Sequence, residues 1–346
     1  MINKTRLFIF CVGCALISIA LTQESQAQIS RNTILVADRD LDAIFTVDPV
    51  TGDRQMLSSA SVGSGVGFQN PYGIAIDPSG TIFVADADLN AILSVDPVTG
   101  DRTVLANAGV GSGPLLDEPL GLAFDSTGDL LVTNQGSANS VLRVDLATGD
   151  RSLVSSGFNR PIGIAYRGSD NTIFVSSIAS DSIESVDLGT GSKTTVSSNS
   201  GVGSGTSFGV PDGIALNAAG NLLYVADFGR EGVIRVNLNN SNRAMISNDV
   251  LGSGDTFNGP ISVVFDETGQ LLVSDSNQGV ERIFSVDPVS GDRVVISGDG
   301  VGSGQAFEGI TFLAVYPVPE PASTAILGVG VLLLSSRRSI RRTLGC

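Results

Sequence analysis

The sequence predicts an all-β protein, a six-bladed β-propeller whose blades are four-stranded antiparallel sheets. Three observations predict this fold: a turn motif that recurs six times, four strand-like segments inside each repeat, and an array that begins and ends with incomplete units. The composition agrees, because 42 glycines among 346 residues and a charged fraction of only 16% favour strands and tight turns over helices.

The recurring motif is VDPVTGD with variants such as VDLATGD and VDPVSGD. Successive copies are separated by 48, 49, 42, 50 and 50 residues, close to the length of one four-stranded propeller blade. The six copies begin at Val47, Val95, Val144, Val186, Val236 and Val286. Six copies at this spacing predict six blades.

Each repeat contains four strand-like segments in the same order, seen clearly in the second repeat. An inner strand (71–77, PYGIAID) is followed by a second strand (81–86, TIFVAD), a third (91–97, AILSVDP) and an outer fourth (102–106, RTVLA). The turns between them carry Pro, Asp and Gly, which set turn geometry and allow positive φ. One repeat is therefore predicted to be a meander of four antiparallel strands.

The two ends of the array predict how the ring closes. The first repeat starts at Ile34 with ILVAD, which corresponds to a second strand and lacks an inner strand before it. The last repeat is followed by residues 309–317, GITFLAVYP, an inner strand with no blade after it. We expect this C-terminal strand to join the N-terminal blade, because such closure removes exposed sheet edges.

Residues 1–27 have the features of a cleavable signal peptide. Two basic residues precede an apolar stretch, and small residues precede a cleavage site after Ala27. A lipoprotein signal that uses Cys14 is a weaker alternative, because the apolar stretch continues past that residue. Removal of the signal leaves Cys346 as the only cysteine, so we expect no disulfide in the exported domain.

Residues 318–346 form a tail with three parts in a fixed order. A Pro-Glu-Pro motif is followed by an apolar stretch, residues 322–334, which is short for a membrane span of about 20 residues. An Arg-rich end follows and is expected to stay cytoplasmic. The motif consists of Pro319, Glu320 and Pro321, and the basic end contains Arg337, Arg338, Arg341 and Arg342.

This order of motif, short transmembrane helix and basic end resembles the PEP-CTERM sorting signal. The resemblance implies processing by an exosortase-type membrane protease in Gram-negative bacteria that make extracellular polysaccharide. Such a chain crosses the inner membrane, contacts the membrane transiently through the C-terminal helix, and reaches the cell surface or the extracellular space. A plain membrane anchor is the alternative that these residues leave open.

The domain between the two ends, residues 28–317, resembles NHL-repeat and gluconolactonase-like six-bladed propellers. The resemblance rests on the repeated order P-x-G-I-A-x-D, G-x-x-x-V-A-D and I-x-x-V-D. It implies the fold and leaves the activity open, because this fold hosts many functions.

The composition excludes several classes of function. The chain has no histidine, which rules out Ser/His/Asp triads, histidine acid–base catalysis and His-ligated zinc. Its net charge is −15, and −19 once the six basic and two acidic residues of the terminal segments are set aside. So acidic a domain repels polyanions, and we expect no nucleic-acid partner.

Three recurring features of the repeats are interpreted as structural. Glycine-rich connections such as GVGSG are expected to be crossovers between blades, since neither a helix nor a P-loop lysine follows them. The basic residue that starts each outer strand, such as Arg102, is expected to form solvated cross-strand pairs. Polar residues that end the second strands either bind calcium together or hold their own loops, and their recurrence favours the loops. They are Asp38, Asp86, Asn134, Ser177, Asp227 and Asp275.

One inner strand breaks the pattern of the others. Earlier inner strands open with Pro-Tyr-Gly, Pro-Leu-Gly or Pro-Ile-Gly, whereas the fifth repeat opens with Pro-Asp-Gly, which places Asp212 there. The resemblance to gluconolactonase-like enzymes implies a metal-binding acid at this point, near the central channel. Asn134 is the candidate for a second ligand, and calcium is the metal that suits such oxygen donors. That family's other ligands find no convincing match, and catalytic residues are left unassigned.

The sequence leaves three hypotheses for the function. The leading one is a non-enzymatic binding or scaffold module at the cell surface or in the extracellular matrix, with polysaccharide or a surface protein as its partner. The alternative is a Ca²⁺-dependent lactonase- or esterase-like hydrolase with Asp212 as a metal ligand. The third is a calcium-stabilised structural protein. A carbohydrate ligand has no direct support, because the chain lacks tryptophan for stacking against sugars.

Overall fold

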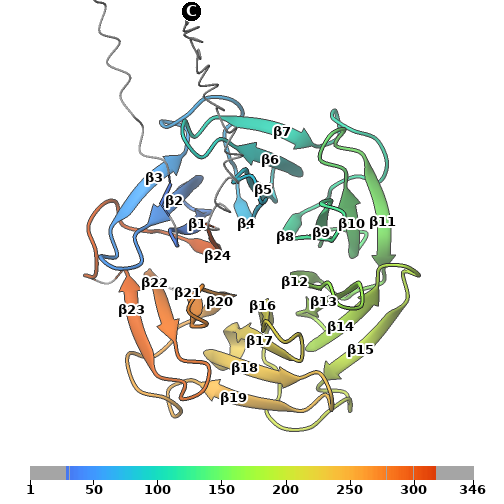
Figure 1. Ribbon diagram of the computed structural model, residues 1–346, viewed down its shortest axis with the longest axis vertical. Helices are drawn as coiled ribbons and strands as arrows, with labels where there is room; N and C mark the ends of the chain where they lie inside the picture. Colours follow the sequence, from blue (N-terminus) through green and yellow to red (C-terminus); the bar gives the residue numbers. More distant parts are fainter. Residues whose placement is uncertain (1–28, 31, 278, 299, 317–346) are drawn as a thin grey trace, which may run out of the picture.

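The computed structural model describes residues 29–30, 32–277, 279–298 and 300–316. In this part of the chain, six sheets of four antiparallel strands surround a central axis as blades (Figure 1). The helical element described is one short 3-10 turn, η1 (Phe228–Arg230). The predicted all-β six-bladed propeller is confirmed.

Each blade runs from an inner strand beside the axis to an outer strand at the rim (Figure 1). Blade 1 contains β24 (Ile310–Val315), β1 (Ile34–Asp38), β2 (Ala43–Val47) and β3 (Arg54–Ser58). Blade 2 contains β4 (Pro71–Ile76), β5 (Ile82–Asp86), β6 (Ala91–Val95) and β7 (Arg102–Ala106). Blade 3 contains β8 (Pro119–Phe124), β9 (Leu130–Asn134), β10 (Ser140–Val144) and β11 (Arg151–Ser156).

The other three blades repeat this order. Blade 4 contains β12 (Pro161–Arg167), β13 (Thr172–Ser177), β14 (Ser182–Asp187) and β15 (Lys193–Ser198). Blade 5 contains β16 (Pro211–Leu216), β17 (Leu222–Asp227), β18 (Gly232–Asn237) and β19 (Arg243–Ser247). Blade 6 contains β20 (Pro260–Phe265), β21 (Leu271–Asn277), β22 (Val280–Val286) and β23 (Arg293–Ser297).

The ring closes in blade 1, where the last strand of the chain pairs with the first. β24 lies antiparallel to β1, with Val315 opposite Ile34 and Leu313 opposite Val36. The expected closure is confirmed, and it gives the N-terminal blade the inner strand that its own repeat lacks.

Apolar side chains fill the space between neighbouring blades. Leu35 and Ile44 of blade 1 belong to one buried cluster with Ile82 and Leu93 of blade 2. The second strands β1 and β5 are buried along their whole length, which explains their continuous apolar sequences. Each such Leu or Ile contributes about 1.5–3 kcal/mol to stability when it is fully buried.

The glycine-rich connections bind to the blade that they enter, as predicted for crossovers. Ser64, in the connection to blade 2, donates from its N–H and its hydroxyl to the Asp101 carboxylate, at 2.7 and 2.8 Å. The same pair of bonds joins Ser112 to Asp150, Ser204 to Asn242, Ser253 to Asp292 and Ser303 to Asp53. Each connection is therefore fastened to the hairpin turn of the next blade.

The expectation that the basic residues of the outer strands are solvated is wrong for four of the six, because only Arg54 and Lys193 are half-buried. Arg102 is only 6% exposed, and its guanidinium donates to the carbonyls of Val66 and Val62 and to the Ser58 hydroxyl. The incoming connection folds back over the start of the outer strand, so the arginine meets loop carbonyls instead of water. Arg151, Arg243 and Arg293 are buried in the same way.

Hydroxyl groups on some second strands bond to the inner strand of the next blade. Ser176 in blade 4 accepts from the Gly163 N–H at 2.8 Å and donates to the Asp212 carbonyl at 2.6 Å. Thr133 and Ser274 donate in the same way to the carbonyls of Ile162 and Thr311. These bonds fix the backbone beside the axis.

No helix among the described residues is long and apolar enough to cross a membrane. The transmembrane helix expected at residues 322–334 lies outside the described part of the chain. The signal peptide and the sorting tail also lie outside it, so all three stay predictions.

Candidate functional site

The inner strands surround the central axis, which is called the channel below, and apolar side chains from several blades meet there. Leu120, Ile162, Ile261 and Phe312 come from four different blades and form one cluster with Tyr72 of blade 2. The ring centroids of Tyr72 and Phe312 lie 5.2 Å apart. Side chains from five inner strands meet in this way because the strands stand around one axis.

In the remaining inner strand, β16 of blade 5, Asp212 stands directly after the first proline, at the position that Leu120 and Ile162 hold in blades 3 and 4. The residue is 6% exposed, and its Oδ1 atom is buried without a hydrogen-bond partner among the described residues. Ser176 holds its backbone carbonyl from the neighbouring blade. A buried carboxylate with an unfilled acceptor is costly unless a proton or a cation neutralises it.

Burial dominates the electrostatics of this acid. Loss of solvent, reinforced by the charge of Asp227, raises the pKa of Asp212 well above its ordinary value, while Arg39 opposes the shift. Loss of solvent and the charge of Asp212 likewise raise the pKa of the Tyr72 hydroxyl well above its ordinary value. Tyr72 therefore stays neutral, and Asp212 holds a proton more readily than an exposed aspartate does.

The mouth of the channel is a cavity of about 450 Å³ that Asp212 shares with groups from other blades. Arg39 and Asp40 enter it from blade 1 and form an exposed ion pair at 3.6 Å. Glu308 lines it from the segment before β24, and Glu281 from β22. Four carboxyl groups therefore line this cavity, together with a single guanidinium group, that of Arg39.

Glu281 is the second partly desolvated acid of the cavity. Its Oε2 atom accepts from the Ile310 N–H at 3.2 Å. Loss of solvent raises the pKa of Glu281, and the bonds from Ser276 and Ile310 oppose that rise only in part. The cavity thus contains two acids, Asp212 and Glu281, whose hydrogen bonds and neighbouring charges do not offset the effect of burial on their pKa.

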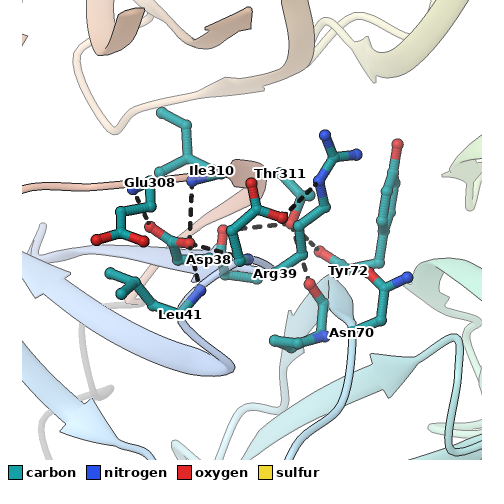
Figure 2. A network of polar contacts seen from close by, with 12 residues as sticks. Asp38, Arg39, Leu41, Asn70, Tyr72, Glu308, Ile310 and Thr311 are labelled. Atoms are coloured by element: carbon teal, nitrogen blue, oxygen red, sulfur yellow. Dashed lines mark hydrogen bonds and ion pairs between the residues drawn. The ribbon is translucent and has the colours of Figure 1, made fainter. Parts of the chain in front are cut away.

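The polar residues at the ends of the second strands hold loops, as their recurrence predicted. Asp38 accepts from the N–H groups of Leu41, Glu308 and Gly309 at 3.1, 2.9 and 3.1 Å, and Figure 2 shows it joining its own loop to the segment before β24. Asp86, Asp227 and Asp275 make equivalent bonds in blades 2, 5 and 6. Ser177 has no such bond, since its buried hydroxyl lacks a partner among the described residues.

Asn134 also holds a loop and does not share a cavity with Asp212. Its Oδ1 accepts from the Asp117 N–H at 2.7 Å, and its Nδ2 donates to the Leu115 carbonyl at 3.3 Å. It lines a different cavity, at the rim of blade 3. Within the described residues no group of three or more Asp, Glu, Cys or His side chains is placed to hold a metal ion. A metal at Asp212 with Asn134 as a ligand stays a prediction from resemblance.

Sequence reasoning found Asp212 but missed Arg39, Tyr72 and Glu281. One signal was available for Arg39, because it is the only charged residue directly after the polar end of a second strand. The residues at that position, from blade 1 to blade 6, are Arg39, Ala87, Gln135, Ile178, Phe228 and Ser276. Glu281 had no comparable signal, since it enters the channel from a third strand.

The residues predicted for export and sorting lie outside the described part of the chain. They are Ala27, Pro319, Glu320, Pro321, Arg337, Arg338, Arg341 and Arg342.

No family model and no curated protein matches the chain. Among solved structures, a nidogen/laminin complex matches with a TM-score of 0.64 at 13% identity, over 83% of this chain and 99% of that chain. Virginiamycin B lyase from Staphylococcus aureus matches with a TM-score of 0.51 at 16% identity, over 72% of this chain and 85% of that chain. At these identities the likeness shows the fold, and the chain is similar to six-bladed propellers of quite different function.

Proposed function

We propose that this chain is an exported propeller of the cell surface or extracellular matrix that acts as a non-enzymatic binding module. We further propose that the channel mouth accepts a primary ammonium group on an apolar stem, such as a lysine side chain of a partner protein. One observation carries this proposal: Asp212 Oδ1 is buried in the channel wall without a partner among the described residues.

The surroundings of Asp212 support a primary ammonium group on an apolar stem as the ligand. An ammonium group neutralises a buried carboxylate and donates the hydrogen bonds that its oxygens lack. Tyr72 and Ile261 line the same cavity and suit the methylene stem, and an aromatic face attracts the cation itself. The surplus of carboxyl groups around Arg39 also attracts cations to the mouth.

Calorimetric titration of the purified protein tests the ammonium site. The probes are N-acetyl-lysine amide and its uncharged counterpart, N-acetyl-norleucine amide. We expect the lysine compound to bind at least about tenfold more tightly than the norleucine compound, and Asp212→Asn to remove that preference. The matched control is Asp249→Asn, an exposed acid away from the channel. Equal binding of the lysine compound by Asp212→Asn and the unaltered protein would overturn the proposal.

The sorting step is proposed from the terminal segments alone. The signal peptide and the Pro-Glu-Pro tail support export followed by exosortase-type processing, with polysaccharide or surface proteins as neighbours of the released domain. Fractionation of the native cells tests it: with Pro319, Glu320 and Pro321 replaced by alanine, the chain should accumulate in the membrane fraction. Unchanged release of this variant would rule out recognition through the motif.

The alternative, a calcium-dependent hydrolase, draws support from the shared cavity of Asp212 and Glu281. If the chain binds calcium, a free calcium concentration 100 times the dissociation constant should raise the free energy of unfolding by about 2.7 kcal/mol. A rise in melting temperature with calcium that disappears in Asp212→Asn, together with lactone turnover, would favour this alternative over the binding module.

A further inference from the structure

The connection that enters blade 4 differs from the other five. It consists of residues 157–160, whereas residues 59–70 connect blade 1 to blade 2 and residues 199–210 connect blade 4 to blade 5. It therefore lacks the glycine-rich segment that the other connections contain. This missing segment accounts for the short spacing of 42 residues between the third and fourth copies of the turn motif.

In the other five blades, the glycine-rich segment covers the outer edge of the outer strand. In blade 5 the Arg243 N–H, at the start of β19, donates to the Ser204 carbonyl at 2.7 Å, and the Met245 N–H donates to Thr206 Oγ1 at 3.0 Å. Gly205 and Arg243 form a parallel bridge. An extended segment parallel to the outer strand is thus the cover of this edge. The first of these bonds recurs from Arg54 to Ser303, Arg102 to Ser64, Arg151 to Ser112 and Arg293 to Ser253.

The corresponding edge of β15 in blade 4 is open. Lys193 and Thr195 hold the places of Arg243 and Met245 in the register of the sheet. Within the described part of the chain, no hydrogen bond from outside the sheet reaches the N–H groups of Lys193 and Thr195. Backbone groups that point out of a sheet in this way are ready to pair with a further strand.

Two substitutions in blade 4 accompany the loss of the cover. Ser192 stands where Asp101 of blade 2 holds the serine of its connection. Lys193 replaces the arginine of the other blades, and its ammonium group donates to the Gly157 carbonyl and lies 4.3 Å from the ring centroid of Phe158. The lysine is therefore held by the short connection, and it does not project from the edge as guarding lysines do.

We propose that the open edge of β15 binds an extended, basic segment of a partner protein, which joins blade 4 as a fifth strand. Five blades show that an extended segment fits along this edge, and main-chain hydrogen bonds to Lys193 and Thr195 hold it. The net charge of −19 on the domain attracts a basic segment. Glu184, opposite Thr195 on β14, adds to this attraction, because its Oε2 atom is buried without a partner among the described residues.

A second copy of the chain fits the edge less well than a basic segment does. Two acidic domains repel each other, and the contact between two six-residue strands is small beside the roughly 1,200–2,000 Å² of stable interfaces. A peptide segment avoids this repulsion and draws its affinity from main-chain hydrogen bonds. The site is also separate from the channel, since β15 lies at the rim of the ring (Figure 1).

Hydrogen–deuterium exchange of the purified protein, read by mass spectrometry over residues 190–200, tests the site. The probes are three capped hexapeptides, in which lysine alternates with valine, glutamate with valine, or lysine with proline. The last keeps the positive charge but lacks every second N–H. At saturation we expect the lysine–valine peptide to slow exchange in this segment at least about fivefold, and the other two to leave it unchanged. A lysine bound in the channel leaves these amides unprotected, so the two proposals fail separately.

Three variants locate the effect on β15. Thr195→Pro removes an outward N–H, a change that edge strands tolerate, and should abolish the protection. Val104→Pro, the matched control at the corresponding place of β7, should keep it. Thr195→Lys retains the backbone and should weaken the protection through repulsion of the basic peptide. Thermal melts show whether each variant is folded.

Four results would overturn the proposal. They are absence of protection by the lysine–valine peptide, equal protection by either of the other peptides, and protection that both Thr195 variants retain. The fourth is a dimer of the protein without peptide that Thr195→Pro dissociates, because this result would assign the edge to a second copy of the chain.

Discussion

Aspartates in this propeller affect stability in opposite ways, depending on where the fold places them. In the exposed turns, hydrogen bonds from Ser64 lower the pKa of Asp101, and the turn is stronger when this acid is ionised. In the channel wall, loss of solvent raises the pKa of Asp212, and the charge of Asp227 adds to the effect. The same residue type thus favours folding in one place when ionised and in the other when protonated.

Asp212→Asn should raise the free energy of unfolding at neutral pH by about 1–3 kcal/mol. The pKa of Asp212 is higher in the folded than in the unfolded chain. Its favourable contribution is therefore complete below the unfolded pKa and is lost as pH rises through the folded pKa. Asparagine keeps the shape without ionising, so the advantage of the variant should vanish at acid pH. Denaturant titrations of both proteins across this pH range measure the difference, and a variant less stable than the unaltered protein at neutral pH would contradict it.

The connection between blades is the element that depends most on its exact residues. Gly63 has a φ of +75°, and a Cβ atom there would overlap the carbonyl group of Gly100 in the hairpin of blade 2. This close approach lets Ser64 reach Asp101 and lets the arginine of the outer strand reach the carbonyls of the connection. Glycine recurs in these connections because the backbone of the connection touches the backbone of the hairpin turn. This contact accounts for the glycines without a phosphate-binding role.

Gly63→Ala and Gly67→Ala form a matched pair for this element. Gly67 lies in the same connection without a positive φ, and a Cβ atom there would meet open space. We expect Gly63→Ala to destabilise the protein by about 1–3 kcal/mol, and Gly67→Ala to change stability by less than about 0.5 kcal/mol. Thermal melts of the two variants check this, and equal melting temperatures would mean that the connection is not held by this contact.

At the scale of the whole molecule, repetition made the ring predictable and single departures from it made Asp212 visible. The motif spacing determined the number of blades, and the unpaired segments at the ends determined the closure. The expectation of cross-strand pairing misplaced Arg102, because it considers only neighbours within a sheet and ignores a connection that folds over the strand. Arg39 and Glu281 meet Asp212 only because the ring brings blades 1, 5 and 6 together, and no local pattern reports such a meeting.

Closure itself gives a prediction for the whole ring. A chain ending at residue 317 retains β24, whereas a chain ending at residue 309 lacks it and leaves β1 as an open edge. The shorter chain also loses buried residues such as Ile310 and Leu313, which contribute about 1.5–3 kcal/mol each. We expect the longer chain to melt cooperatively as a monomer, and the shorter one to aggregate through its unpaired edge or to melt far lower. Size-exclusion chromatography and thermal melts distinguish the two. If both chains behaved alike, the stability of the propeller would reside in the individual blades, and the pairing of β24 with β1 would add little.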